Sequence, residues 1–107
     1  MSTKKEKLLD AVREELKNNS VFCKSELSNA RIVEILSIQI DSHTPSEIGC
    51  DSIEKWETVS CSFKIRIDKN NNGCSSVHDA SARFTISGYN DETNEFSVSL
   101  TGCITVL

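Results

Sequence analysis

Residues 58–68 (TVSCSFKIRID) alternate between apolar and polar side chains without interruption, and this alternation constrains the fold more than any other feature of the chain. Successive side chains of a strand point to opposite faces of a sheet, so a period of two predicts a strand with one buried face. The side chains predicted to face inward are Val59, Cys61, Phe63, Ile65 and Ile67. The segment therefore indicates a sheet with an apolar face and a polar face.

Two further segments repeat this pattern and one resembles it less closely. Residues 76–88 and 95–107 are predicted strands, whose inward side chains would be Ala80, Ala82, Phe84 and Ile86, then Phe96, Val98, Leu100, Ile104 and Val106. Turn signals at Asn72-Gly73 and at 89–94 separate the strands, which predicts an antiparallel meander. Residues 31–41 form the fourth predicted strand, but apolar side chains occur on both parities: Ile32, Leu36, Ile38 and Ile40 on one, Val33 and Ile35 on the other. Either both faces of this strand are covered or a bulge changes its phase.

The remaining regular element is a helix over residues 3–18. Leu8, Leu9, Val12 and Leu16 recur at helical spacing, and Thr3 with Glu6 forms a capping-box pair. The chain therefore predicts a single domain over 1–107 of the α+β class. Its architecture is an N-terminal helix packed on a four-stranded antiparallel β-meander (α-β-β-β-β), in two layers.

Composition excludes several functional classes. The chain carries 12 Lys+Arg against 16 Asp+Glu, a net charge of -4, which argues against binding nucleic-acid phosphates. We expect no membrane span and no signal segment, and hence a cytoplasmic protein. The 5 cysteines are odd in number and widely spaced, which predicts free thiols rather than a zinc site or disulfides.

The order of helix and meander is similar to that of cystatin-like folds, although only at the level of architecture. The Gln-x-Val-x-Gly hairpin of that family is absent, because the nearest segment, residues 39–43, reads QIDSH. The resemblance therefore implies no membership of the family.

The predicted inner face of the last three strands carries no Asp, Glu, Lys or Arg, so we expect no catalytic residues, no cofactor and no enzyme activity. One helix, about 10–12 Å wide, is too narrow to cover four strands that span roughly 19 Å. The favoured function is a binding or interaction protein that self-associates as a homodimer or docks on a protein partner. The alternative is a small-molecule-binding domain or weak enzyme with a cavity between helix and sheet, whose rim would carry His78, Glu34, Tyr89 or Trp56.

Two surfaces are candidates for the contact. The outer face of the sheet is rich in serine and threonine, which fits either a solvated surface or an interface. The second candidate is the acidic connection over 42–57, where Trp and Ile beside acids resemble a protein-binding hot spot. Its candidate residues are Glu47, Asp51, Ile53, Glu54, Trp56 and Glu57, although the Trp and Ile side chains would instead pack under the sheet if the loop is only a connection.

Residues 68–79 partly match the calcium-loop pattern of EF-hand proteins. Oxygen ligands would come from Asp68, Asn70, Asn72 and Asp79. The strand pattern before the loop and the shorter acid at its last position favour a polar hairpin turn instead. His43 and His78 have no ligand spacing, so no metal site is expected elsewhere.

Overall fold

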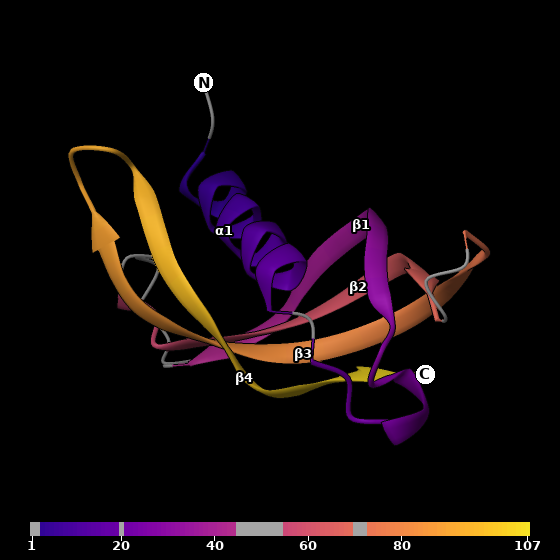
Figure 1. The fold of residues 1–107 in the computed structure, drawn as a ribbon. Helices are drawn as coiled ribbons and strands as arrows, with labels where there is room; N and C mark the ends of the chain where they lie inside the picture. Colours follow the sequence, from indigo (N-terminus) through magenta and orange to yellow (C-terminus); the bar gives the residue numbers. More distant parts are fainter. Residues whose placement is uncertain (1–2, 20, 45–54, 70–72) are drawn as a thin grey trace.

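The computed structural model describes residues 3–19, 21–44, 55–69 and 73–107, and it contains one helix packed on a four-stranded antiparallel sheet (Figure 1). The strands lie side by side in the order of the sequence, β1-β2-β3-β4. The predicted α+β fold class is therefore confirmed. The elements are α1 (Lys4–Asn18), a short 3-10 helix η1 (Ser25–Leu27), β1 (Arg31–Thr44), β2 (Thr58–Asp68), β3 (Ser75–Asn90) and β4 (Glu95–Val106).

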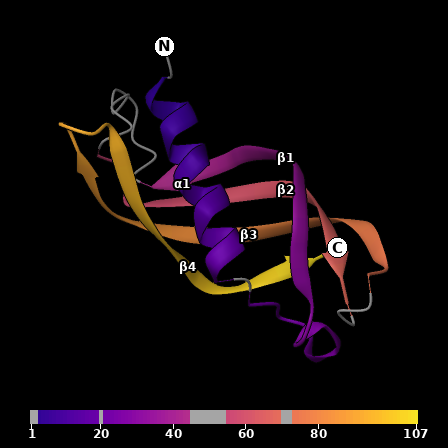
Figure 2. The same ribbon diagram turned by 45° about the horizontal axis from the view of Figure 1, so that its top comes forward.

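Helix α1 begins where the capping-box pair predicts. The Thr3 side chain accepts a hydrogen bond from the Glu6 backbone N–H at 3.2 Å, which satisfies one amide of the first turn. The buried stripe consists of Leu8, Val12 and Leu16. Leu9 belongs to the predicted stripe but is only half-buried, because it is rotated about 100° from Leu8 around the helix. The helix lies on one face of the curved sheet (Figure 2).

The core follows the parity of β2, β3 and β4. All five predicted inward side chains of β2 are buried, and Phe84 of β3 is fully buried among them. On β4, Phe96, Ile104 and Val106 are buried, while Val98 and Leu100 are half-buried and pack against the core. The apolar wall predicted from the alternation is therefore present, and α1 covers it on one side (Figure 1).

Strand β1 changes phase through bulges. Its register against β2 shifts between Ile32 and Glu34, between Ile35 and Ser37, and between Ile40 and Ser42. As a result Ile32, Ile35, Ile38 and Ile40 pack against the core. The prediction that Leu36 faces inward is wrong, since its side chain is 40% exposed. The extra residues bend the strand sharply, as both ribbon views show (Figures 1 and 2).

The β3–β4 hairpin is longer than predicted. A register shift between Ile86 and Gly88 turns Tyr89 inward, where its ring packs on Phe96 at 4.6 Å between centroids. Strand β3 therefore continues to Asn90. The turn consists of residues 91–94, and not of residues 89–94 as predicted. Asn94 has a φ of 61°, a left-handed conformation that asparagine tolerates in a turn.

The prediction that all cysteines are free thiols is wrong. Cys23 and Cys103 form a disulfide across 80 positions of sequence. The bond lies where residues 21–23 run alongside β4: the Ile104 N–H donates to the Val21 carbonyl at 2.7 Å, and the Cys23 N–H donates to the Ile104 carbonyl at 2.9 Å. Among the described residues, Cys61 is a buried thiol and Cys74 is an exposed thiol. Cys50 lies outside the described residues.

In the part of the chain that the structure describes, no helix combines the length and the apolar character needed to cross a bilayer.

Candidate binding groove

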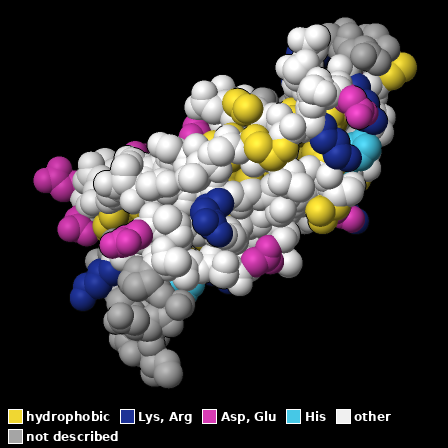
Figure 3. Space-filling model, turned by 90° about the horizontal axis from the view of Figure 1, so that it is seen from below, with side chains coloured by type: hydrophobic (Ala, Val, Ile, Leu, Met, Phe, Trp, Pro, Cys, Tyr) yellow, Lys and Arg dark blue, Asp and Glu magenta, His cyan; other side chains and the backbone are white. Residues whose placement is uncertain are grey.

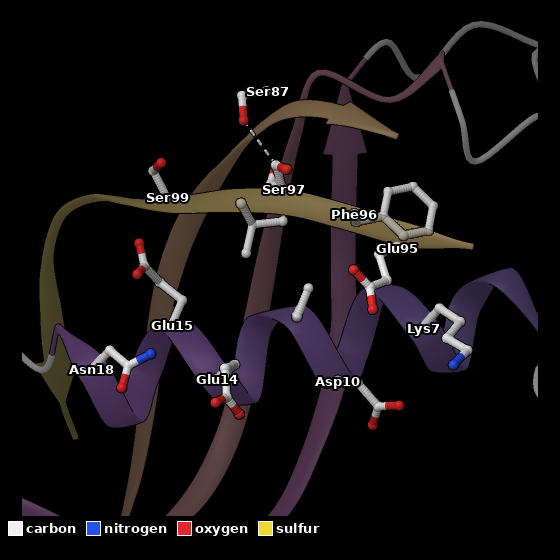
Figure 4. A pocket seen from close by; sticks show the side chains of 12 residues that line it. Lys7, Asp10, Glu14, Glu15, Asn18, Ser87, Glu95, Phe96, Ser97 and Ser99 are labelled. Atoms are coloured by element: carbon white, nitrogen blue, oxygen red, sulfur yellow. Dashed lines mark hydrogen bonds between the residues drawn. The ribbon is translucent and has the colours of Figure 1, made fainter. Parts of the chain in front are cut away.

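A groove of about 650 Å³ lies between α1 and the first half of β4 (Figure 4). The helix contributes side chains at a spacing of three and four, which places them on one face beside the buried stripe. These helix residues are Lys7, Asp10, Ala11, Glu14, Glu15 and Asn18. The opposite wall consists of Ser87 of β3 and residues 95–99 of β4.

The charge of this lining is strongly one-sided. It contains four carboxylates, from Asp10, Glu14, Glu15 and Glu95, and one ammonium group, from Lys7. Glu15 points from the helix toward β4 and Glu95 points from β4 toward the helix, while Asp10 and Glu14 lie on the outer side of the helix (Figure 4). The groove therefore has an acidic interior and an acidic rim.

The backbone of β4 also faces this groove. Along a strand, the N–H and C=O groups of successive residues point alternately to the two neighbouring sides. The Ser97 carbonyl accepts a hydrogen bond from the Ser87 hydroxyl at 3.0 Å, so odd-numbered residues of this stretch face β3. The Leu100 N–H donates to the Glu15 carboxylate at 2.7 Å, so even-numbered residues face the free edge.

It follows that Phe96 and Val98 direct their N–H and C=O groups toward the edge. The described part of the chain offers these groups no hydrogen-bond partner. An unpaired strand edge is a template for another strand, and proteins usually cover or disrupt it. Here bulges disrupt the opposite edge at β1, and residues 21–23 cover the second half of β4. Among the described strands, the start of β4 is thus an edge that no other segment covers, and the extra residue of the nearby register shift, Ser87, belongs to β3 rather than to β4.

The side chain of Cys61 is buried in the core of the sheet. Burial raises the pKa of the Cys61 thiol to about 12, and the negative charge of Asp41 adds to the rise. This thiol is therefore protonated at neutral pH and is not a nucleophile. No group of three metal-ligating side chains occurs within residues 3–19, 21–44, 55–69 and 73–107.

The acidic connection is described only at its ends. Glu47, Asp51, Ile53 and Glu54 lie outside the described residues, and β1 already occupies the first positions of the predicted 42–57 connection. Trp56 is half-buried, packs against the core and stacks on the His43 ring at 3.7 Å between centroids. Glu57 is exposed, but its backbone N–H donates to Thr44. Packing against the core and against His43 therefore explains the presence of Trp56, which the sequence predicted as a candidate contact residue.

The calcium-loop candidates do not converge. Asp68 is buried, and its carboxylate accepts the Gly73 N–H at 3.2 Å, as in a tight polar turn. In the register of β2 and β3, Asp68 lies opposite Ser75 and Asp79 lies opposite Lys64. Asp79 is therefore four residues beyond Ser75 along β3, a distance of about 13 Å. Asn70 and Asn72 lie outside the described residues.

The rim residues predicted for a helix–sheet cavity are also dispersed. Glu34 pairs with Arg66 at 3.6 Å near one end of the sheet, whereas Tyr89 packs on Phe96 at the other end. His78 hydrogen-bonds to Ser76 at 2.7 Å, and Trp56 contacts His43. These four side chains therefore do not form a common site.

On the outer face of the sheet, apolar, basic and acidic side chains are scattered among uncharged polar side chains and backbone (Figure 3). Several hydroxyls bond to neighbouring strands: Thr85 to Thr101 at 2.6 Å, and Ser62 to the Asp41 carboxylate. These hydroxyl groups are therefore already hydrogen-bonded within the sheet. A shallow hollow on it is lined by Asp41, Ser60, Ser81, Arg83, Thr101 and Thr105, among others.

The groove beside β4 has no local signal in the amino-acid sequence. Its acidic residues belong to a helix and a strand far apart in the sequence, and only the packing of α1 against the sheet edge brings them together. In comparisons with protein-family models, curated proteins and solved structures, the chain matches none of them.

Proposed function

We propose that this protein is a non-enzymatic interaction module that docks on a protein partner, and that the α1–β4 groove is its contact site. The observation that carries this proposal is the edge of β4 at Phe96 and Val98, which faces an acidic groove and lacks backbone partners among the described residues. Unpaired edges in natural sheets are generally disrupted or occupied. Both protective devices occur in this sheet. Opposite Ser97 and Val98 the register also shifts, but the extra residue, Ser87, belongs to β3, so β4 itself carries no bulge there. Residues 21–23 pair with β4 only at Ile104.

The alternative of a small-molecule site receives less support. The volume of the groove lies within the range of such sites, but those sites are mostly apolar and enclosed. This groove is open along the edge and carries four carboxylates. A protein segment, which supplies its own backbone donors and acceptors, matches this lining better.

The proposal can be tested by selecting binders from a random peptide library displayed on phage. Each selected peptide is then titrated into the ¹⁵N-labelled protein. We expect amide shifts to concentrate at residues 95–100 and on the groove side of α1. If no peptide binds, or if binders shift other surfaces only, the proposed site is wrong.

Self-association through the outer sheet face is a second candidate function. The observation that favours it is the exposed Val77 on β3, which lies opposite Arg66 in the sheet, on the face where Thr85 and Thr101 carry hydroxyl groups. Light scattering after size exclusion, at micromolar concentrations, tests this. A monomer at every concentration removes the homodimer from consideration.

The disulfide offers a test of where in the cell the protein resides. The sequence predicts a cytoplasmic protein, whereas disulfides such as Cys23–Cys103 persist mainly in oxidising compartments. If the protein resides in the cytoplasm, we expect glutathione to reduce this bond. Thiol trapping in intact cells, followed by mass spectrometry of the peptides that contain the two cysteines, distinguishes the two cases.

A further inference from the structure

We propose that the partner segment is an extended peptide rich in lysine or arginine, which adds to the free edge of β4 as a further strand. This inference rests on the proposed function, because it names the class of ligand that the α1–β4 groove binds. It is carried by two independent features, the backbone geometry of the edge and the charge of the groove.

Another part of the same edge already pairs with a strand-like segment of the chain. At Ile104, both the N–H and the C=O bond to residues 21–23, which run parallel to β4 as a short added strand. Phe96 and Val98 have the same parity as Ile104 and direct the same two groups toward the same edge. A peptide at the groove would therefore repeat an interaction that this strand makes with its own chain.

The position of Glu15 limits the length of the added strand. Its carboxylate accepts the Leu100 N–H at 2.7 Å and occupies the end of the groove. The available backbone groups are thus those of Phe96 and Val98, each with one donor and one acceptor. A short segment of about four to six residues is enough to use them, since only alternate residues of a strand pair with a given neighbour.

The charge of the groove selects the side chains of the peptide. Glu95 and Glu15 point into the groove, and Glu14 and Asp10 stand on its rim. Lys7 supplies the single opposing charge in this lining. Asp10 is already paired with Arg13 at 3.0 Å, and the Glu15 carboxylate accepts hydrogen bonds from Asn19 and Leu100. Alternate side chains of an added strand project toward the helix side, where lysine or arginine would meet Glu14 and Glu95.

The same charges disfavour a second copy of this chain as the occupant. Pairing two β4 edges would bring Glu95 and Glu15 of both copies into one interface. The chain also carries a net charge of -4, so two copies repel each other at long range. A basic peptide has the opposite charge and satisfies the backbone equally well.

The experiment uses two synthetic probes with the same pattern, Ac-GKVKVG-NH₂ and Ac-GEVEVG-NH₂, each with a fluorescent label. We expect the lysine probe to bind the full chain by fluorescence anisotropy, with affinity that falls as salt is raised, and the glutamate probe not to bind. Replacing both Glu14 and Glu95 with Gln should weaken binding of the lysine probe about fivefold. The matched control replaces Glu26 and Glu92, two exposed acids outside the groove lining, with Gln. This variant should bind the lysine probe as tightly as the wild type does.

Val98→Pro tests the backbone contact. Proline removes an N–H that faces the free edge and leaves the bonds to β3 in place, so the fold should tolerate it. We expect a loss of about tenfold in affinity, whereas Val98→Ala, which shortens the side chain and keeps the N–H, should lose less than about threefold.

Residue-resolved amide exchange gives a readout that needs no variant. The amides of Phe96 and Val98 should exchange fast in the free protein and slowly with the lysine probe bound, while those of Ser97 and Ser99, which face β3, are protected in both states. Equal binding of both probes, or no change at Phe96 and Val98, overturns the inference. If the protection of these amides rises with protein concentration in the absence of the probe, a second copy of the chain is the occupant. This result also overturns the inference. Selected peptides that bind the groove but are not basic would contradict this inference and leave the proposed function intact.

Discussion

Removal of the Cys23–Cys103 disulfide should destabilise the protein more than any other change to its surface. The bond closes a loop of 80 positions, and in the chain-entropy treatment a loop of this size restricts the unfolded chain by about 4–5 kcal/mol. A domain of this length has a total stability of about 5–15 kcal/mol. The double substitution Cys23→Ser with Cys103→Ser should therefore leave a protein that is folded but close to the limit of stability.

Urea unfolding, followed by tryptophan fluorescence and circular dichroism, measures this loss. The free energy of unfolding of a domain of this size falls by about 1.5 kcal/mol per molar urea, so the loss of the disulfide should lower the midpoint by about 3 M. Wild-type protein kept in a reducing agent should unfold at the same midpoint as the double variant. Cys74→Ser, which removes an exposed thiol and no disulfide, is the matched control and should leave the midpoint unchanged. If the oxidised protein and the double variant unfold at the same urea concentration, the reasoning is refuted.

Three further predictions concern the core, the helix and the buried thiol. Phe84→Ala should cost about 3–5 kcal/mol in thermal unfolding, since the ring is fully buried; a loss below 1 kcal/mol would contradict its place in the core. Thr3→Ala should cost about 1 kcal/mol and Thr3→Ser nearly nothing, because only the first removes the cap; equal losses would contradict this role. In a variant with Cys50 and Cys74 replaced by serine, Ellman's reagent at pH 8 should detect Cys61 only after unfolding, since burial raises the pKa of this thiol to about 12; a fast reaction in the folded state would contradict its burial.

The most regular strands could be predicted from the sequence alone. The alternation over 58–68 identified every buried apolar side chain of β2, because each face of this central strand has one constant environment; the buried Asp68 at its end was not predicted. The capping box at Thr3 likewise located the start of α1. In these segments the local pattern and the tertiary structure require the same residues at the same positions.

The sequence was less informative where bulges interrupt the period of two. In β1, Leu36 has the parity of Ile38 but the bulge between Ile35 and Ser37 turns it outward. In β3, the shift after Ile86 turns Tyr89 inward and lengthens the strand. A bulge adds a residue to one strand only, so its presence depends on the partner strand and not on the local sequence.

The disulfide and the groove could not be predicted for a related reason. Cys23 precedes the sheet in an irregular segment, and only the path of residues 21–23 along β4 brings it to Cys103. Glu15 and Glu95 come together in the same way, through the position of α1 beside the edge strand. Both features depend on how distant segments pack, which local periodicity does not encode.

The two borders of this sheet differ in a way that limits assembly. A filament that grows strand by strand needs a receptive border at each end of every subunit, so that each addition creates the next site. Here the β1 border is kinked by three register shifts, and the β4 border is already occupied over its second half. Addition at the start of β4 would present no equivalent border to a following molecule, so growth stops after one step.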